Sequence, residues 1–224
     1  MIKYKKGDVM FNNMILWNLS YGIYVISVMD NGRPTGCIAN CAMQLTTDTI
    51  AISLNHKNHT NEVIKRNKEF SISILSNNSD RNIISVFGFT SGRDKNKFEN
   101  IDYTIINNLP IIKDCSGYIT LKTIQELELE THTLFIAKIT GGDLLNNEIP
   151  MTYKYYHDVI KGRAPKAAPT YIDPEKIVQK EENGKEPRYK CKICGYIYEG
   201  DITKEDINYV CPICKQPKSV FIPF

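Results

Sequence analysis

Four cysteines near the C-terminal end of the chain have the spacing of a metal site. Two Cys-x2-Cys pairs, Cys191/Cys194 and Cys211/Cys214, lie within the last few dozen residues. Four thiolates in a tetrahedron suit either zinc or iron, so the spacing alone leaves a structural zinc site open beside a redox-active iron site. Chains below about 40 residues usually need a metal, a disulfide or a partner to fold. We therefore expect the metal to hold this segment together.

A second group of residues suited to binding chemistry lies between Gly36 and Thr60. Residues 36–44 lead through a turn into an apolar strand, and residues 55–60 then open a helix. The amides of a helix N-terminus, the hydroxyl of Thr60 and the cation of Lys57 together make a natural phosphate site. Thr60 is equally compatible with a plain N-cap, with Glu62 favourably placed in the first turn.

The composition is that of a folded globular protein. With 224 residues, of which 42% are hydrophobic, the chain has room for one substantial domain and one small one. The net charge of +3 comes from interspersed acids and bases, which argues against nucleic acid as a partner. The longest apolar run, residues 14–29, is interrupted by polar residues and falls short of the roughly 18 apolar residues that span a bilayer. We expect no membrane partner.

The cysteine count indicates the cellular compartment. Seven cysteines are present, and four belong to the metal site, which leaves Cys37, Cys41 and Cys115. An odd set of remaining thiols fits a reducing cytoplasm better than a disulfide framework. No small-residue cleavage site follows the early lysines, so secretion is not supported. We expect a cytoplasmic protein.

The elements that must position these residues are mostly strands. Short β-branched or aromatic segments are separated by turn signals and predict strands at 21–29, 36–40, 49–54, 70–75, 118–130 and 133–140. Six or more such strands indicate a closed barrel. The alternation in residues 70–74 predicts one solvated face, and Gly141-Gly142-Asp143 predicts a turn. Helices are expected at 9–19, at 60–67 and at 80–87, the last one ended by Gly88.

A change in composition divides the chain. Residues 161–186 are rich in Gly, Pro, Ala, Lys and Glu, and include Pro165, Pro169 and Pro174. Such a stretch is too long and polar for a buried connection. We therefore expect a large domain at 1–160, a linker at 161–186 and a small metal-binding domain at 187–224.

The residues around the cysteines resemble rubredoxin. That family has Cys-x2-Cys-Gly-Tyr-x-Tyr, then Cys-Pro-x-Cys, then a Lys and a Phe, which Lys218 and Phe221 match. The resemblance implies one iron held by Cys191, Cys194, Cys211 and Cys214. The 16 residues between Cys194 and Cys211 are fewer than in free-standing rubredoxins. Lys215 stands where the family usually has Gly, and a left-handed backbone there would cost about 1–2 kcal/mol.

The large domain resembles the flavin reductases with an FMN-binding split barrel. Gly36, Ala39 and Asn40 match that family's Gly-x-x-Ala-Asn, Ser53-Leu54-Asn55 matches its Ser-Leu-Asn, and Thr60 matches a helix cap. The resemblance implies a mainly β fold, an FMN-binding split β-barrel with flanking helices, in a homodimer with FMN at the interface. It implies flavin contacts from Ala39, Asn40, Cys41, Ser53, Asn55 and Thr60, with Lys57, Arg93 and Lys97 as cations near the phosphate.

One histidine is a candidate for the catalytic centre. His132 partly matches a Gly-Asp-His-like motif that lies near the nicotinamide or flavin ring in related reductases, although Glu130-Thr131 precede it. A hydrogen-bonded packing histidine explains the residue equally well. Hydride transfer requires no acid or base, so we assign no firm catalytic side chain.

A flavin reductase domain followed by a rubredoxin domain resembles the high-molecular-weight rubredoxins of anaerobic bacteria along nearly the whole chain. The resemblance implies an NAD(P)H-dependent FMN/rubredoxin oxidoreductase that passes electrons to a flavodiiron protein reducing NO or O2. Two other functions remain open. One is a free-flavin reductase with a structural zinc module, and the other is a flavoredoxin-like carrier reduced by a protein donor.

Overall fold

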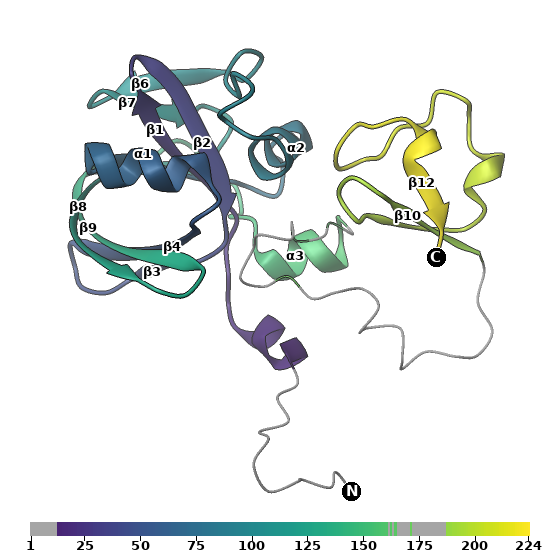
Figure 1. Cartoon of the computed structure of the whole chain (residues 1–224), viewed down its shortest axis with the longest axis horizontal. Coiled ribbons are helices and arrows are strands. Elements are labelled where there is room, and N and C mark those ends of the chain that lie inside the picture. The colour runs from purple at the N-terminus through teal and green to yellow at the C-terminus, as the bar shows by residue number, and fades with distance from the viewer. Residues whose placement is uncertain (1–12, 161, 163, 165–170, 172–186) are drawn as a thin grey trace, which may run out of the picture.

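The computed structural model describes residues 13–160, 162, 164, 171 and 187–224. A β-barrel with three short α-helices forms the large body, and a small three-stranded body contains the C-terminus (Figure 1). Most of the predicted linker, 161–186, lies outside the described residues, so the domain boundaries stay predictions.

The barrel is built on one seven-stranded antiparallel sheet with the strand order β2-β1-β5-β8-β9-β4-β3. Each of the six predicted strands is present, and β3 is additional. The strands are β1 (Tyr24–Asp30), β2 (Arg33–Ala39), β3 (Ala42–Gln44), β4 (Thr49–Asn55), β5 (Glu69–Ile74), β8 (Gly117–Glu128) and β9 (His132–Leu144). The mainly β prediction is confirmed.

A tight turn fixes the register of β1 on β2. Asn31 and Gly32 have φ angles of 49° and 83°, as a two-residue hairpin turn requires, and Asp30 pairs with Arg33. Pro34 already lies in β2, opposite Met29. The short turn therefore sets which residues of β2 face the barrel interior.

The predicted solvated face of β5 is wrong. Ser71 and Ser73 are fully buried, because a two-stranded ribbon, β6 (Tyr103–Ile106) and β7 (Leu109–Ile112), packs over them. The Ser71 hydroxyl donates to the Pro110 carbonyl at 2.6 Å, and the Ile112 amide donates to the Ser73 hydroxyl at 3.1 Å. Both serines thus satisfy buried backbone groups of the ribbon.

The predicted turn at Gly141-Gly142-Asp143 is also wrong, since these residues lie inside β9 and pair with Thr120, Ile119 and Tyr118. The register shifts between Thr120 and Leu121, as at a β-bulge. A Cβ atom on Gly142 would lie 2.8 Å from the Tyr118 carbonyl oxygen. These glycines therefore allow two strands to approach closely, and do not reverse the chain.

Three α-helices flank the sheet: α1 (His59–Asn67), α2 (Arg81–Phe89) and α3 (Tyr153–Asp158). Asp80 caps α2 by accepting from the Asn82 amide at 2.9 Å, and Gly88 lies inside the helix instead of ending it. The described part of the predicted 9–19 helix is a 3-10 helix, η1 (Asn13–Asn18), and α3 was not expected. The N-cap of α1 is Asn58, so the prediction that Thr60 is the cap is wrong by two residues.

The small body has three antiparallel strands in the order β11-β10-β12. Their bounds are β10 (Arg188–Cys191), β11 (Ile197–Glu199) and β12 (Phe221–Pro223), with 3-10 turns η3 (Ile202–Lys204) and η4 (Lys218–Val220). Its core is aromatic, with Tyr196 and Tyr209 edge-on to Phe221 at 6.3 and 6.1 Å between ring centroids. So small an apolar core makes the metal site the main source of its stability.

Candidate redox sites

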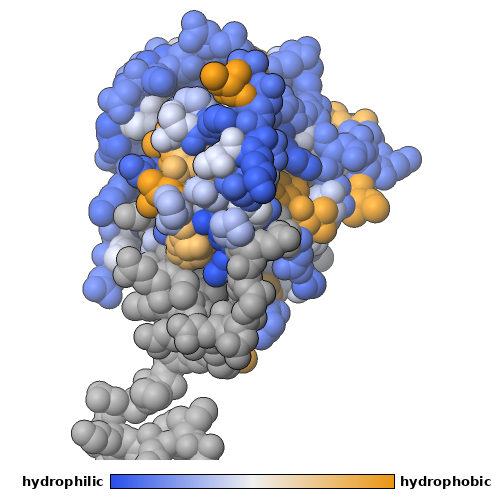
Figure 2. All heavy atoms as spheres, turned by 90° about the vertical axis from the view of Figure 1, so that its right-hand side faces the viewer, coloured by the Kyte–Doolittle hydropathy of each residue, from blue (hydrophilic) through white to orange (hydrophobic). Residues whose placement is uncertain are grey.

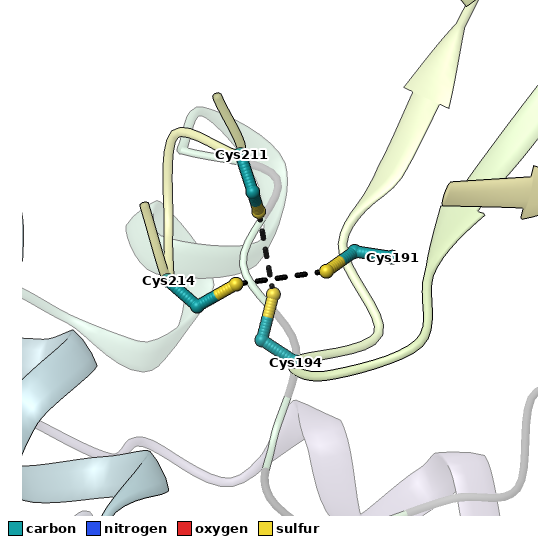
Figure 3. Close-up of side chains that lie close together, drawn as sticks. All are labelled: Cys191, Cys194, Cys211 and Cys214. Carbon is teal, nitrogen blue, oxygen red and sulfur yellow. Dashed lines mark hydrogen bonds between the residues drawn. The ribbon is translucent and has the colours of Figure 1, made fainter. Parts of the chain in front are cut away.

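The four predicted metal ligands converge on one point (Figure 3). All four cysteines are buried, and their Sγ atoms lie within 4.8 Å of one another. The pairs Cys191/Cys214 and Cys194/Cys211 are 3.6 and 3.5 Å apart. A tetrahedron of sulfurs about 2.3 Å from a metal has edges of about 3.8 Å, so the donor set fits one tetrahedral ion.

The two Cys-x2-Cys turns, which we call knuckles, share one backbone geometry. Gly195 and Lys215 follow the knuckles with φ angles of 76° and 56°, and their amides donate to the carbonyls of Cys191 and Cys211, each at 2.9 Å. Gly195 adopts the left-handed region without a side-chain penalty, and Lys215 adopts the same region, where a side chain is disfavoured.

Hydrogen bonds couple the thiols to one another. The thiols of Cys194 and Cys211, with the amides of Cys194 and Ile193, lower the pKa of Cys191, whereas sharing of protons with neighbouring thiols raises the pKa of Cys194 and of Cys211. The amides of Cys214 and Ile213 donate to the Cys211 sulfur in the same way. Such donors stabilise negative charge on sulfur and tune a metal–thiolate centre.

A pocket opens in the barrel between β2, β4, α2 and α3. Five of the predicted residues line it together: Ala39, Asn40, Ser53, Asn55 and His132. The rest of the lining is Ile23, Cys37, Ile38, Leu54, Asn58, Ile84, Phe87, Gly88, Phe89, Tyr153, Tyr156 and Ala164. Apolar walls with a few amide and hydroxyl groups at one edge suit a flat, mostly apolar ring system with polar edges, so the residues fit a flavin.

Cys41 lies just outside this lining, between β2 and β3. Its carbonyl accepts a hydrogen bond from the Ser53 amide at 3.2 Å, which ties the two predicted flavin-binding segments together. Burial raises the pKa of the Cys41 thiol, so it is neutral at pH 7. The thiol can act there as a weak hydrogen-bond donor.

His132 begins β9 and pairs with Asn55 at the end of β4. Its Nδ1 atom lies 2.7 Å from the Thr131 hydroxyl, which fixes the ring orientation at the pocket wall. His132 therefore lies at the edge of the pocket. The sequence alone was equally compatible with a site residue and with a packing histidine.

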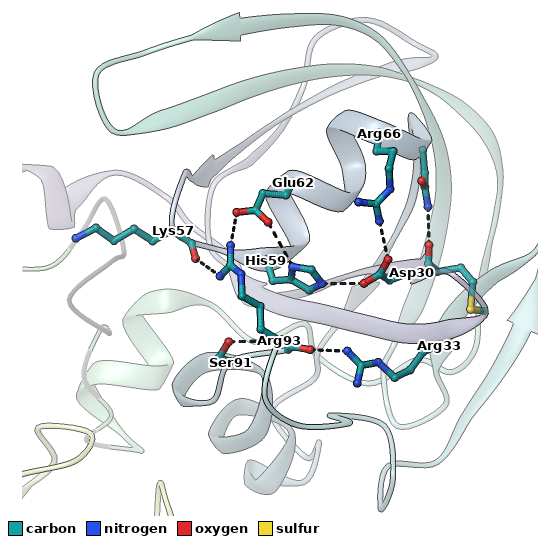
Figure 4. Close-up of polar contacts among 11 residues, drawn as sticks. Asp30, Arg33, Lys57, His59, Glu62, Arg66, Ser91 and Arg93 are labelled. Carbon is teal, nitrogen blue, oxygen red and sulfur yellow. Dashed lines mark hydrogen bonds and ion pairs between the residues drawn. The ribbon is translucent and has the colours of Figure 1, made fainter.

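One of the predicted phosphate cations, Arg93, belongs to an ion-pair network at the start of α1 (Figure 4). Arg93 donates to the Lys57 carbonyl at 3.2 Å and pairs with Glu62, while the Lys57 ammonium points away from the network. Beside them, His59 contacts Asp30 at 2.8 Å. The network joins α1 to the β1–β2 turn and to the loop around Arg93.

Thr60 and Lys97 lie beneath this surface, with 1% and 5% of their area exposed. The Lys97 ammonium donates to the carbonyls of Gly36 and Phe87 at 2.8 and 3.2 Å. Burial lowers the pKa of Lys97, and nearby Cys37 partly opposes this effect. Lys97 therefore braces β2 against α2 in this structure, and neither residue lines the pocket among the described residues.

Tyr153 and Tyr156 are pocket residues that the sequence analysis did not single out. Both are buried in α3, at 5% and 3% exposed, and line the pocket opposite β2 and β4. The Thr152 hydroxyl caps this short helix by accepting from the Tyr155 amide at 3.1 Å. The run of tyrosines before the linker was the available signal.

These two sites define a class of protein: a flavin-binding barrel joined to a four-cysteine redox domain. Residues 16–162 match the family described as "Flavin reductase like domain", and residues 189–222 match "Rubrerythrin, rubredoxin-like domain". The chain therefore belongs to the flavin reductase-like family and carries a C-terminal rubredoxin-like domain with an iron-type four-cysteine site.

Curated relatives agree with this assignment. The chain is 35% identical to the high molecular weight rubredoxin of Moorella thermoacetica, with 92% of this chain and 96% of that protein aligned. It is 32% identical to the ferric-chelate reductase (NAD(P)H) of Archaeoglobus fulgidus, over 70% of this chain and 95% of that protein. The similarity to the first relative spans both domains, and the similarity to the second covers 161 residues.

Solved structures share the barrel fold. Flavin reductase PheA2 in its native state has a TM-score of 0.54 at 23% identity, covering 63% of this chain and 93% of that chain. Flavoredoxin from Methanosarcina acetivorans has a TM-score of 0.53 at 16% identity, covering 64% of this chain and 74% of that chain. Among the described residues, no helix is both long and apolar enough to cross a membrane.

Proposed function

We propose that this protein is an NAD(P)H-dependent oxidoreductase that passes electrons through FMN to its iron centre and on to a redox protein such as a flavodiiron NO/O2 reductase. The observation that carries the proposal is the presence, on one chain, of a flavin-reductase pocket and a four-cysteine rubredoxin-type site. A reductase that released its electrons only to soluble flavin would not need the second centre.

FMN held in this pocket would supply two-electron acceptance of a hydride and one-electron release, and iron held by the four cysteines would supply one-electron exchange. The overall balance is one NAD(P)H and two oxidised iron centres giving NAD(P)+, one proton and two reduced centres. No protein group needs to carry a proton to the nicotinamide. The residues of the chain bind and orient the cofactors and the nicotinamide, and exclude water from them.

The proposed flavin contacts divide into two sets. Ala39, Asn40, Ser53 and Asn55 line the pocket edge and suit the polar rim of the ring, with Cys41 beside them and His132 at the wall. Lys57, Arg93, Thr60 and Lys97 are the candidates for the phosphate end. Of these, Lys57 and Arg93 lie at the surface near the start of α1, and Arg93 would exchange its pairing with Glu62 for the phosphate.

A homodimer is part of the proposal. Large apolar side chains stand exposed on β3 and at the far end of β8, including Met43 at 61%, Ile124 at 61% and Leu127 at 51% exposed. Exposed apolar groups of this size on one sheet favour burial against a second copy. Sedimentation at micromolar concentration tests this point, and a monomer there would contradict it.

The direct test is anaerobic NADH and NADPH oxidation with a purified flavodiiron protein and NO or O2 as final acceptor. We expect the chain to stimulate turnover of that partner. Nicotinamide oxidation that requires added soluble flavin, with zinc in the cysteine site, would favour the free-flavin reductase instead. A flavin reduced by proteins but not by nicotinamide would favour the flavoredoxin-like carrier.

The flavin placement has its own test. Asn40 is 6% exposed and lines the pocket, so Asn40→Leu should weaken FMN binding at least about tenfold by removing a polar contact and adding bulk. The exposed Asn100 lies outside this pocket, and Asn100→Leu is the matched control. Unchanged FMN affinity in Asn40→Leu, measured by fluorescence titration, would show that the flavin lies elsewhere.

A further inference from the structure

The two knuckles of the metal site are equivalent in sequence and backbone but differ in exposure. Ile193 in Cys-Lys-Ile-Cys is 54% exposed, whereas Ile213 at the same place in Cys-Pro-Ile-Cys is 1% exposed. The residues after the two knuckles share the left-handed backbone and the same amide-to-carbonyl bond. Local geometry therefore does not explain the difference, and something outside the second knuckle must cover Ile213.

The buried cluster around Ile213 extends into the barrel. One continuous cluster of buried residues joins Ile213 and Cys214 to Ile83, Ile84 and Phe87 of α2. The small body lies beside α2 in Figure 1. Apolar packing thus connects the small domain to this helix.

The same helix forms a wall of the barrel pocket. Ile84 and Phe87 line the pocket, and both belong to the cluster that includes Ile213. A cofactor in the pocket and a metal at the cysteines would therefore be connected through the packed side chains of one buried cluster. Close packing without intervening water is what favours rapid electron transfer between fixed centres.

We propose that the two knuckles have separate roles: the second knuckle docks through Ile213 on α2 of its own chain and receives electrons there, and the first knuckle serves the external acceptor. This assignment of roles rests on the proposed function, whereas the docking stands on burial and packing alone. Figure 2, viewed from the side of the small domain, shows apolar patches separated by hydrophilic surface, a pattern suited to brief contacts with a protein partner.

Exposure of the two isoleucines can be measured on the unaltered protein. Hydroxyl-radical footprinting of the iron-loaded chain, read by mass spectrometry, should label Ile193 several-fold faster than Ile213. Equal labelling would overturn the docked arrangement. Because no residue is changed, this measurement does not depend on how a variant folds.

A matched pair of variants tests what the contact does. Ile213→Glu places a charge in the buried contact, and Ile193→Glu places the same charge on the exposed knuckle. With iron retained, hydrogen–deuterium exchange of residues 81–89 should increase in Ile213→Glu and stay at the wild-type level in Ile193→Glu. Unchanged exchange of α2 in an iron-loaded Ile213→Glu protein would contradict docking.

The rate of electron transfer from flavin to iron within the chain distinguishes failure of the docking proposal from failure of the proposed function. After anaerobic photoreduction of the flavin, transfer to iron should slow by about tenfold or more in Ile213→Glu, because a fixed contact becomes a tethered encounter, and should not change in Ile193→Glu. Equal internal rates in the two variants would overturn the division of roles. Wild-type protein that is docked by footprinting but shows no flavin-to-iron transfer would refute the proposed function and leave the docking intact.

Discussion

At the residue scale, Lys215 shows how the metal site imposes a local cost. Its φ angle of 56° places a lysine in the left-handed region, and its amide closes the second knuckle on the Cys211 carbonyl. The equivalent position in the first knuckle is Gly195, which adopts the same conformation without a Cβ penalty. Both knuckles therefore have the same backbone geometry, but only the second one carries backbone strain.

Relief of this strain is measurable. Lys215→Gly should stabilise the small domain by about 1 kcal/mol, because glycine adopts the left-handed region without the penalty that a side chain brings. The readout is the midpoint of thermal loss of the ferric–thiolate absorbance. Lys192→Gly, at an exposed residue of the first knuckle with no positive φ, is the control and should bring no gain. A Lys215→Gly protein no more stable than wild type would count against the strain argument.

At the element scale, two glycines had their roles misjudged from sequence, and the structure explains both. Gly88 was expected to end α2 but lies within it, with only the Ile38 side chain 3.7 Å from where a Cβ would be. Gly142 was expected in a turn but lies where β9 approaches β8, and its Cβ would meet a backbone oxygen at 2.8 Å. One site has room for a methyl group and the other does not.

Alanine substitutions at Gly88 and Gly142 should change the free energy of unfolding in opposite directions. Gly88→Ala should raise the free energy of unfolding by about 0.5–1 kcal/mol, as expected for glycine replaced inside a helix. Gly142→Ala should lower it by about 1–3 kcal/mol, because a backbone oxygen cannot move aside cheaply. Urea denaturation of the two variants measures both values. If Gly142→Ala were as stable as wild type, the assigned strand register at that point would be wrong.

The sequence predicted the helices and strands better than it predicted what packs against them. Six strands were predicted because β-branched alternation and turn residues are local signals. The burial of Ser71 was not, because its partner Pro110 lies 39 residues away in a ribbon that no local pattern connects to β5. The four cysteine ligands could be predicted from their spacing, whereas iron rather than zinc followed only from the resemblance to rubredoxin. The pocket role of Tyr153 and Tyr156 could not be predicted from the sequence, since it depends on where α3 packs.

At the scale of the whole molecule, the two sites belong to bodies that are stabilised differently. The barrel has a second buried cluster of its own around Phe70, Phe135 and Ile52, whereas the small domain relies on its metal. In such small domains the free energy of metal binding is largely the free energy that stabilises the fold. Each cofactor should therefore be removable without loss of the other.

Reciprocal variants test this independence. Cys194→Ser should abolish the iron spectrum and unfold the small domain while FMN stays bound and reducible, and Asn40→Leu should lose FMN while keeping the iron spectrum. Visible absorbance with metal and flavin analysis measures both. Loss of FMN in Cys194→Ser would mean that the barrel needs the small domain to hold its cofactor.

The central claim is that one chain carries electrons from a nicotinamide to iron. The most direct test is an anaerobic titration of the purified protein with NADH, followed by visible absorbance, with iron, zinc and flavin measured on the same sample. We predict that the flavin and ferric–thiolate bands both bleach, with about 1.5 NADH consumed per chain for one two-electron and one one-electron centre. Bleaching of the flavin alone in an iron-loaded sample, or no response of either band, would contradict the account.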